Sequence, residues 1–102
     1  MAKAYWIAAH MTIEDPDKLM AYAKQTRPVI EAHGGRFLAR GGRVVTMEGF
    51  EQPRVIVTEF QSLEEAVACY NSDGYQAAKA KLGSGVERDI CIVEGLELGL
   101  RP

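Results

Sequence analysis

Residues 34–43 read GGRFLARGGR, a short apolar segment between two glycine pairs, with arginines at positions 36, 40 and 43. The helical pattern before it ends at Gly34, because glycine tolerates the positive φ that terminates many helices. The chain then enters a strand that we predict over residues 36–48, with Gly41 and Gly42 in its middle. Glycine inside a strand marks a bulge or a close approach of another group to the backbone. The stretch therefore predicts a strand that is disturbed directly after Arg40.

Capping signals and periodicity predict the other elements. Asp15 and Pro16 open a helix that runs to Gly34, and Ser62 opens a capping box before a second helical region. The remaining predicted elements are strands at residues 4–12, 54–60 and 88–94 and a short helix at residues 73–82. The order β-α-β-β-α-β predicts an α+β, ferredoxin-like single domain over residues 1–102, with helices on one face of a four-stranded antiparallel sheet.

Composition excludes several classes of function. The chain has 12 basic and 14 acidic residues and no basic run, so we expect no nucleic acid partner. No apolar run is long enough to span a bilayer, and we expect no membrane partner. Cys69 and Cys91 are interpreted as reduced core residues of a cytoplasmic protein. Residues 95–102 are expected to pack on the surface or on a partner.

Three of the predicted strands are apolar on both faces. Their centres are Tyr5-Trp6-Ile7, Val55-Ile56-Val57 and Ile90-Cys91-Ile92. Helices cover only one face of a ferredoxin-like sheet, and monomers rarely expose a large apolar face. The pattern therefore predicts a homodimer in which a second copy covers the open face.

Arg40 and Glu59 are the first candidates for chemistry. Counting back from the turn between their strands places them close to opposite each other. A charged residue among apolar strand positions has to be paired if it is buried. The pair is either a structural ion pair or an anion-binding arginine beside a carboxylate that accepts a proton.

His10 lies at the end of the first predicted strand, on the face that carries Trp6 and Ala8 by alternation. It is either a partly buried structural residue or a general base at the mouth of a pocket. With Arg40 and Glu59 it completes the set of predicted catalytic residues.

Aromatic residues and the second glycine pair form the predicted ligand-binding set. The tyrosines lie on apolar helix faces, where they either fill the core or turn their hydroxyls into a pocket between the sheet and the helices. The set consists of Trp6, Tyr22, Gly41, Gly42, Tyr70 and Tyr75.

The sequence lacks the motifs of metal, nucleotide and covalent chemistry. Two histidines and two cysteines show no metal-ligand spacing, so we expect no metal. The glycine-rich segments lack the strand-to-helix context of a phosphate loop, and no nucleophile motif is present. We expect no cofactor, which leaves cofactor-free proton transfer or oxygenation of a small organic molecule.

Several short motifs together resemble a known family: Tyr5-Trp6, residues 34–38, Arg40-Gly41-Gly42, Glu59-Phe60, Tyr70-x-Ser72, Tyr75-Gln76-x-Ala78 and Val93-Glu94-Gly95. The chain is similar to a small bacterial family of dimeric α/β barrels that is known only as a domain of unknown function. The superfamily also holds antibiotic-biosynthesis monooxygenases, muconolactone isomerase and chlorite-dismutase-like proteins. The resemblance implies a dimer with a pocket between sheet and helices in each protomer, and it implies no activity. Asp73 replaces a proline that the resemblance leads us to expect after Ser72.

Three functions are compatible with these patterns. The first is a homodimeric small-molecule protein, either a cofactor-independent monooxygenase or an isomerase. The second is a non-catalytic dimeric module with a binding, structural or stress-related role. The third is an interaction domain that uses exposed strand edges. The sequence leaves open whether the chain is an enzyme.

Overall fold

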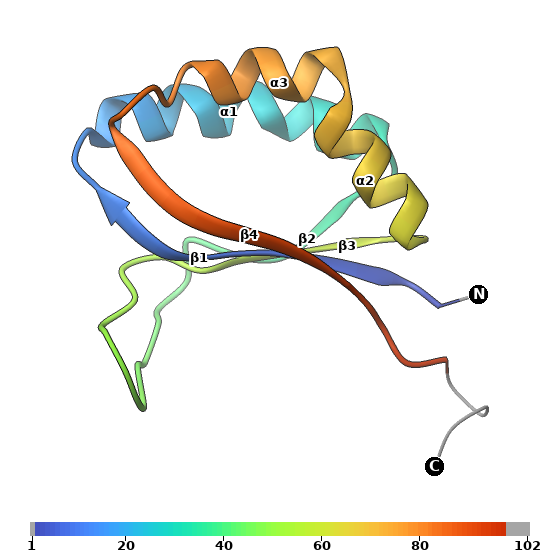
Figure 1. Cartoon of the computed structure of the whole chain (residues 1–102), viewed down its shortest axis with the longest axis horizontal. Coiled ribbons are helices and arrows are strands. Elements are labelled where there is room, and N and C mark those ends of the chain that lie inside the picture. Colours follow the sequence, from blue (N-terminus) through green and yellow to red (C-terminus); the bar gives the residue numbers. More distant parts are fainter. Residues whose placement is uncertain (1, 98–102) are drawn as a thin grey trace.

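The computed structural model describes residues 2–97, which form a four-stranded sheet with three helices on one face (Figure 1). The part of the tail at residues 98–102 lies outside the described residues. None of the described helices has the length and apolar character needed to cross a bilayer. In chain order the elements are β1 (Ala4–Ile13), α1 (Pro16–Ala32), β2 (Arg36–Arg40), β3 (Ile56–Phe60), α2 (Leu63–Asn71), α3 (Asp73–Ala80) and β4 (Val86–Glu94).

The sheet has the strand order β2-β3-β1-β4, and all neighbours are antiparallel. β1 is central, so Trp6 is opposite Thr58 of β3 and Ile92 of β4. The two last helices meet at Ser72, whose hydroxyl oxygen accepts a hydrogen bond from the Tyr75 N–H at 3.2 Å. The predicted α+β, ferredoxin-like arrangement is confirmed, with the second helical region divided into α2 and α3.

Local signals set both ends of α1 as predicted. The Asp15 carboxylate accepts a hydrogen bond from the Asp17 N–H at 3.1 Å, which satisfies a donor of the first turn. At the other end Gly34 has φ +82°, and the Gly35 N–H donates to the Ile30 carbonyl at 2.9 Å. This turn sends the chain from α1 directly into β2.

Aromatic rings join the sheet to α2 and α3. The Trp6 ring lies on the helix-facing side of β1, with its centroid 6.0 Å from Phe60, 5.6 Å from Tyr70 and 5.0 Å from Tyr75. Phe60 and Tyr75 are completely buried. This cluster is the centre of the core.

The predicted strand over residues 36–48 is wrong beyond Arg40, where β2 ends. Gly41 has φ +78°, which turns the chain out of the sheet. Val45 and Met47 suggest a strand by residue type, yet they are 75% and 84% exposed and pair with no strand that the structure describes. The connection from β2 to β3 instead extends away from the helices (Figure 1). The bulge lies between residues 37 and 39 rather than at the glycine pair.

The two cysteines differ in their surroundings. Cys69 on α2 is buried as predicted, but Cys91 on β4 is exposed, so its interpretation as a core residue is wrong. Ile90 and Ile92 face the helices and pack against the core, and alternation turns Cys91 to the open face of the sheet.

Gly35 lies where α1 meets the sheet, with no room for a side chain. A Cβ atom there would lie 2.5 Å from Ile30 Cγ2 and 2.9 Å from Phe60 Cε1. We expect Gly35→Ala to lower the free energy of unfolding by about 1–3 kcal/mol in urea denaturation, as other overpacked cores do. Gly42→Ala is the matched control, because nothing lies within 4 Å of its Cβ position. Equal losses in the two variants would contradict this packing.

Candidate functional site

A cavity of about 20 Å³ lies between α1 and the helix-facing side of the sheet. This volume holds about one water molecule. No carboxylate or imidazole lines it among residues 2–97, and these residues contain no group of three or more potential metal ligands. Its apolar walls include Trp6, Leu19, Ile30, Phe37 and Ile56. Its polar lining consists of Tyr22, Thr26, Thr58, Arg40, Arg54 and Arg88.

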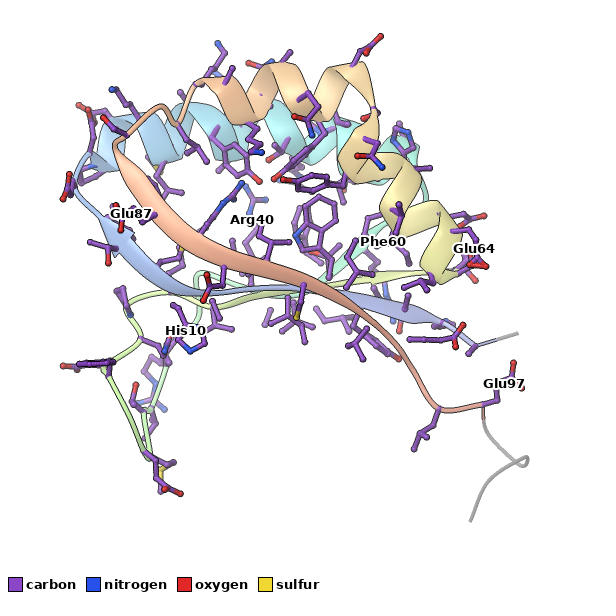
Figure 2. The ribbon with its side chains drawn as sticks, viewed as in Figure 1. His10, Arg40, Phe60, Glu64, Glu87 and Glu97 are labelled. Carbon is purple, nitrogen blue, oxygen red and sulfur yellow. The ribbon has the colours of Figure 1, made fainter. Side chains whose placement is uncertain are left out.

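Arg40 reaches this cavity because of the bulge in β2. The register with β3 shifts between Phe37 and Ala39, so Phe37 and Arg40 face the same side although they are three positions apart. The Arg40 guanidinium carbon lies 4.7 Å from the Phe37 ring centroid, and its Nη2 donates to the Ala23 carbonyl at 3.3 Å. In Figure 2 Arg40 extends between α1 and the sheet. An aromatic face and a carbonyl hold this cation, and no carboxylate among residues 2–97 pairs with it.

Arg54 precedes β3 and lines the same cavity. Its Nε atom is buried and has no hydrogen-bond partner in the described part of the chain. A Cβ atom at Gly41 would lie 3.5 Å from Arg54 Nη1, so the Gly41 backbone lies against the guanidinium. Arg40, Gly41 and Arg54 also line an outer groove of about 600 Å³ beside α1. The side chains of Arg40 and Arg54 therefore line both the cavity and the outer groove, and they separate the two.

Tyr22, Tyr75 and Arg88 form a hydrogen-bonded chain beside the cavity. Arg88 Nη2 donates to Tyr75 Oη at 2.8 Å, and the two tyrosine oxygens are 2.7 Å apart. Burial raises the pKa of Tyr75, so its hydroxyl keeps its proton at neutral pH. A guanidinium only donates, so Tyr75 accepts from Arg88 and is free to donate to Tyr22. In that arrangement the Tyr22 hydroxyl proton is available to a group in the cavity.

His10 lies away from this cavity. The prediction that it shares a face with Trp6 and Ala8 is wrong, because a bulge in β1 adds a residue at this point. His10 takes the left-handed backbone conformation, with φ +53°, and its side chain is 64% exposed. Its Nδ1 lies 3.4 Å from an Asp89 carboxylate oxygen, and its N–H donates to Gln52 Oε1 at 2.7 Å. A catalytic role for His10 stays a prediction.

Glu59 is paired, but not with Arg40. Arg36 is directly opposite Glu59, whereas Arg40 is opposite Ile56, so the predicted pairing is wrong. The prediction assumed that the strand continued past Gly41, and β2 ends earlier. Glu59 Oε1 lies 3.3 Å from Lys3 Nζ and 3.3 Å from Arg36 Nη2. Its carboxylate is thus part of an ion pair network outside the cavity lining, and its catalytic role stays a prediction.

The predicted ligand-binding residues are divided among several places. Trp6 and Tyr22 line the cavity, and Gly41 lies in the outer groove next to it. Tyr70 lines a separate groove of about 250 Å³ at β4. Gly42 lines a third groove of about 650 Å³ at the end of β1. The structure therefore brings together Trp6, Tyr22 and Gly41 with Arg40.

The sequence prediction missed Arg54 and Arg88. Arg88 is two residues before Ile90, and Arg54 is two residues before Ile56. In a strand this spacing places each arginine on the face of the apolar residue that follows. A cation in register with core-facing apolar positions indicates an arginine on the core side of the sheet, and this signal was present in both predicted strands.

The sequence matches the model of a known protein family. A family model matches residues 3–96. The chain belongs to the DUF1330 family, a domain of unknown function. This membership confirms the resemblance seen in the sequence. Among curated proteins, none is significantly similar in sequence to this chain.

Solved structures share the fold at low sequence identity. A protein of unknown function from Rhodopseudomonas palustris is 17% identical, with a TM-score of 0.73 over 94% of this chain and 84% of that one. SnoaB from Streptomyces nogalater, a cofactor-independent oxygenase, is 8% identical, with a TM-score of 0.67 over 99% of this chain and 100% of that one. A candidate antibiotic biosynthesis monooxygenase from Caulobacter crescentus is 14% identical, with a TM-score of 0.58 over 94% and 92%. These likenesses establish the fold of the dimeric α/β-barrel proteins for this DUF1330 chain.

Removal of the Tyr75 hydroxyl tests the hydrogen-bonded chain. We expect Tyr75→Phe to lower the free energy of unfolding by about 1–3 kcal/mol, because Arg88 and Tyr22 lose their shared partner in a buried setting. Urea denaturation measures this loss. Tyr70→Phe is the control, since the Tyr70 hydroxyl bonds only to the exposed Lys79 amine, at 2.9 Å, among the described residues. A loss in Tyr75→Phe no larger than that in Tyr70→Phe would contradict the assigned chain.

Proposed function

We propose that this DUF1330 protein is a homodimer that binds a small organic molecule in the cavity at α1 and converts it by cofactor-independent oxygenation or isomerisation. The observation that carries this proposal is the lining of the cavity. Apolar and aromatic walls surround a few polar groups, which is typical of small-molecule sites. The arginines and the Tyr22 hydroxyl supply donors for an oxyanion or enolate.

The chemistry proposed depends on charge that develops in the substrate. A substrate acidic enough to lose the proton next to its carbonyl to solvent water binds as the enolate, which hydrogen-bond donors in a water-poor cavity stabilise. Return of the proton at a different carbon gives an isomer, and reaction of the enolate with dioxygen gives an oxygenated product. Likeness in fold to SnoaB, a cofactor-independent oxygenase, supports the second route.

A non-catalytic binding module is the second candidate. The observation that favours it is the absence of a carboxylate or imidazole from the cavity lining within residues 2–97. A reaction that starts by proton removal needs an acceptor within hydrogen-bond reach. In this function the donors hold a ligand that the protein leaves unchanged.

A thermal-shift screen with small phenols, lactones and carboxylic acids tests binding. We expect at least one of these classes to raise the melting temperature, because a ligand that binds only the native state stabilises it. We expect Arg40→Met to keep the fold and lose the shift, since Arg40 lines the cavity. Arg43→Met is the matched control, because Arg43 lines a different groove.

The same ligands separate the two candidates. Oxygen uptake or an isomer seen by NMR favours the enzyme, whereas binding without conversion favours the binding module. No shift with any of the three classes would contradict a small-molecule function.

The open face of the sheet supports the proposed homodimer. Val57, Ile7 and Cys91 are directly opposite one another on three adjacent strands and form an apolar row on this face. Val93 on the same face is 49% exposed. The helices α1, α2 and α3 all lie on the other face (Figure 1). A second copy related by a two-fold axis would cover this surface.

Thiol labelling tests this dimer with the protein's own residues. Both cysteines are free, in keeping with the cytoplasmic location that we propose. We expect Cys91 to react with a maleimide more slowly as the protein concentration rises, because the dimer covers it. Cys69 is the internal reference, since burial raises the pKa of its thiol to about 11 and makes it unreactive. Fast Cys91 labelling at micromolar concentration, with a monomer in sedimentation, would contradict the dimer.

A further inference from the structure

We infer that the ligand of this cavity is a small organic carboxylate whose acid group is held by Arg54 and Arg40. This inference rests on the proposed small-molecule function and adds the chemical class of the ligand. It depends on the charge of the lining, on one unsatisfied donor, and on the position of the two arginines between two spaces.

Among residues 2–97 the lining carries three guanidinium groups and no acid. A partly buried cation has to recover the hydration that it loses. Arg88 does so through the Tyr75 hydroxyl and the Tyr22 ring, and Arg40 through a carbonyl and the Phe37 ring. None of these partners neutralises the positive charge. The cavity lining therefore carries positive charge that nothing in the described part of the chain neutralises, and a bound anion would neutralise it.

Arg54 shows where that anion binds. Its Nε–H is buried without a hydrogen-bond partner among residues 2–97. A buried donor without an acceptor is destabilising, and proteins rarely retain one without a reason. The Nε and one Nη of a guanidinium form a planar fork that matches the two oxygens of a carboxylate. A carboxylate at Arg54 would satisfy the donor and supply the missing negative charge.

The shape of the site selects an organic acid over inorganic phosphate. Arg40 and Arg54 line both the cavity of about 20 Å³ and the outer groove of about 600 Å³. The cavity beyond them has aromatic and aliphatic walls, including Trp6 and Phe37. These walls suit a hydrocarbon or aromatic body, which an organic acid has and inorganic phosphate lacks. The ligand therefore enters from the groove, moves the two side chains, and keeps its carboxylate between them.

Pairs of acids and amides test this class directly. The probes are benzoate and phenylacetate, each compared with benzamide or phenylacetamide, by calorimetric titration of the intact protein. We expect each acid to bind the unchanged protein at least about tenfold more tightly than its amide, because the charge-assisted hydrogen bonds are lost in the amide. This comparison needs no variant and does not depend on whether a mutant folds.

Arg54→Met should weaken binding of the acids by about tenfold or more and leave the amides nearly unchanged. Arg27→Met is the matched control, because it removes the same charge from an exposed position on α1 whose ionic partner in the described part of the chain is Glu31. Amides that bind as tightly as the acids, inorganic phosphate that binds more tightly than either acid, or acid binding that survives Arg54→Met would overturn the inference. Binding of neutral phenols or lactones without the acids would also overturn it, while the proposed function would stand. Absence of binding by every class would reject both.

Discussion

The Tyr75 side chain connects every layer of this small domain. Its ring packs at 5.0 Å from Trp6 on the sheet and at 5.0 Å from Tyr70 on α2. Its hydroxyl bridges Tyr22 of α1 and Arg88 of β4. Because the residue is completely buried, both the ring and the hydroxyl need partners within the protein. Together with the packing of Ile30 in the core and the Arg40–Ala23 hydrogen bond, this contact point holds α1 over the sheet and so forms the cavity between them.

Two bulges determine which side chains reach the cavity. Side chains of a regular strand alternate between faces, so residues three apart lie on opposite sides. The extra residue in β2 brings Phe37 and Arg40 to one face, and the extra residue in β1 turns His10 outward. The left-handed backbone of His10 is the local cost of this arrangement, about 1 kcal/mol or more for a residue other than glycine. Each bulge adds one residue to its strand, and the side chains that follow it therefore point to the opposite face from the one that simple alternation predicts.

Features that depend on residues close in sequence could be predicted from the sequence, whereas features that depend on the register between strands could not. The start of α1 at Asp15 and its end at Gly34 depend on neighbouring backbone groups, and both were predicted correctly. The pairing of Arg40 depends on a register that one inserted residue changes, and no local signal reveals such an insertion. Arg88 could have been found, because β4 is regular at this point and alternation places it with Ile90. The apolar open face of the sheet could also be predicted, because the sequences of three strands are apolar at successive positions.

The small volume of the cavity has a thermodynamic consequence for recognition. With space for about one water molecule, the closed form excludes every organic ligand. The measured dissociation constant is then the intrinsic one divided by the fraction of molecules in which Arg40 and Arg54 have moved aside. Each ~1.4 kcal/mol needed for that opening weakens apparent affinity about tenfold. This opening cost applies equally to an acid and to its amide, so it lowers both affinities and leaves the ratio between them to the charge of the two arginines.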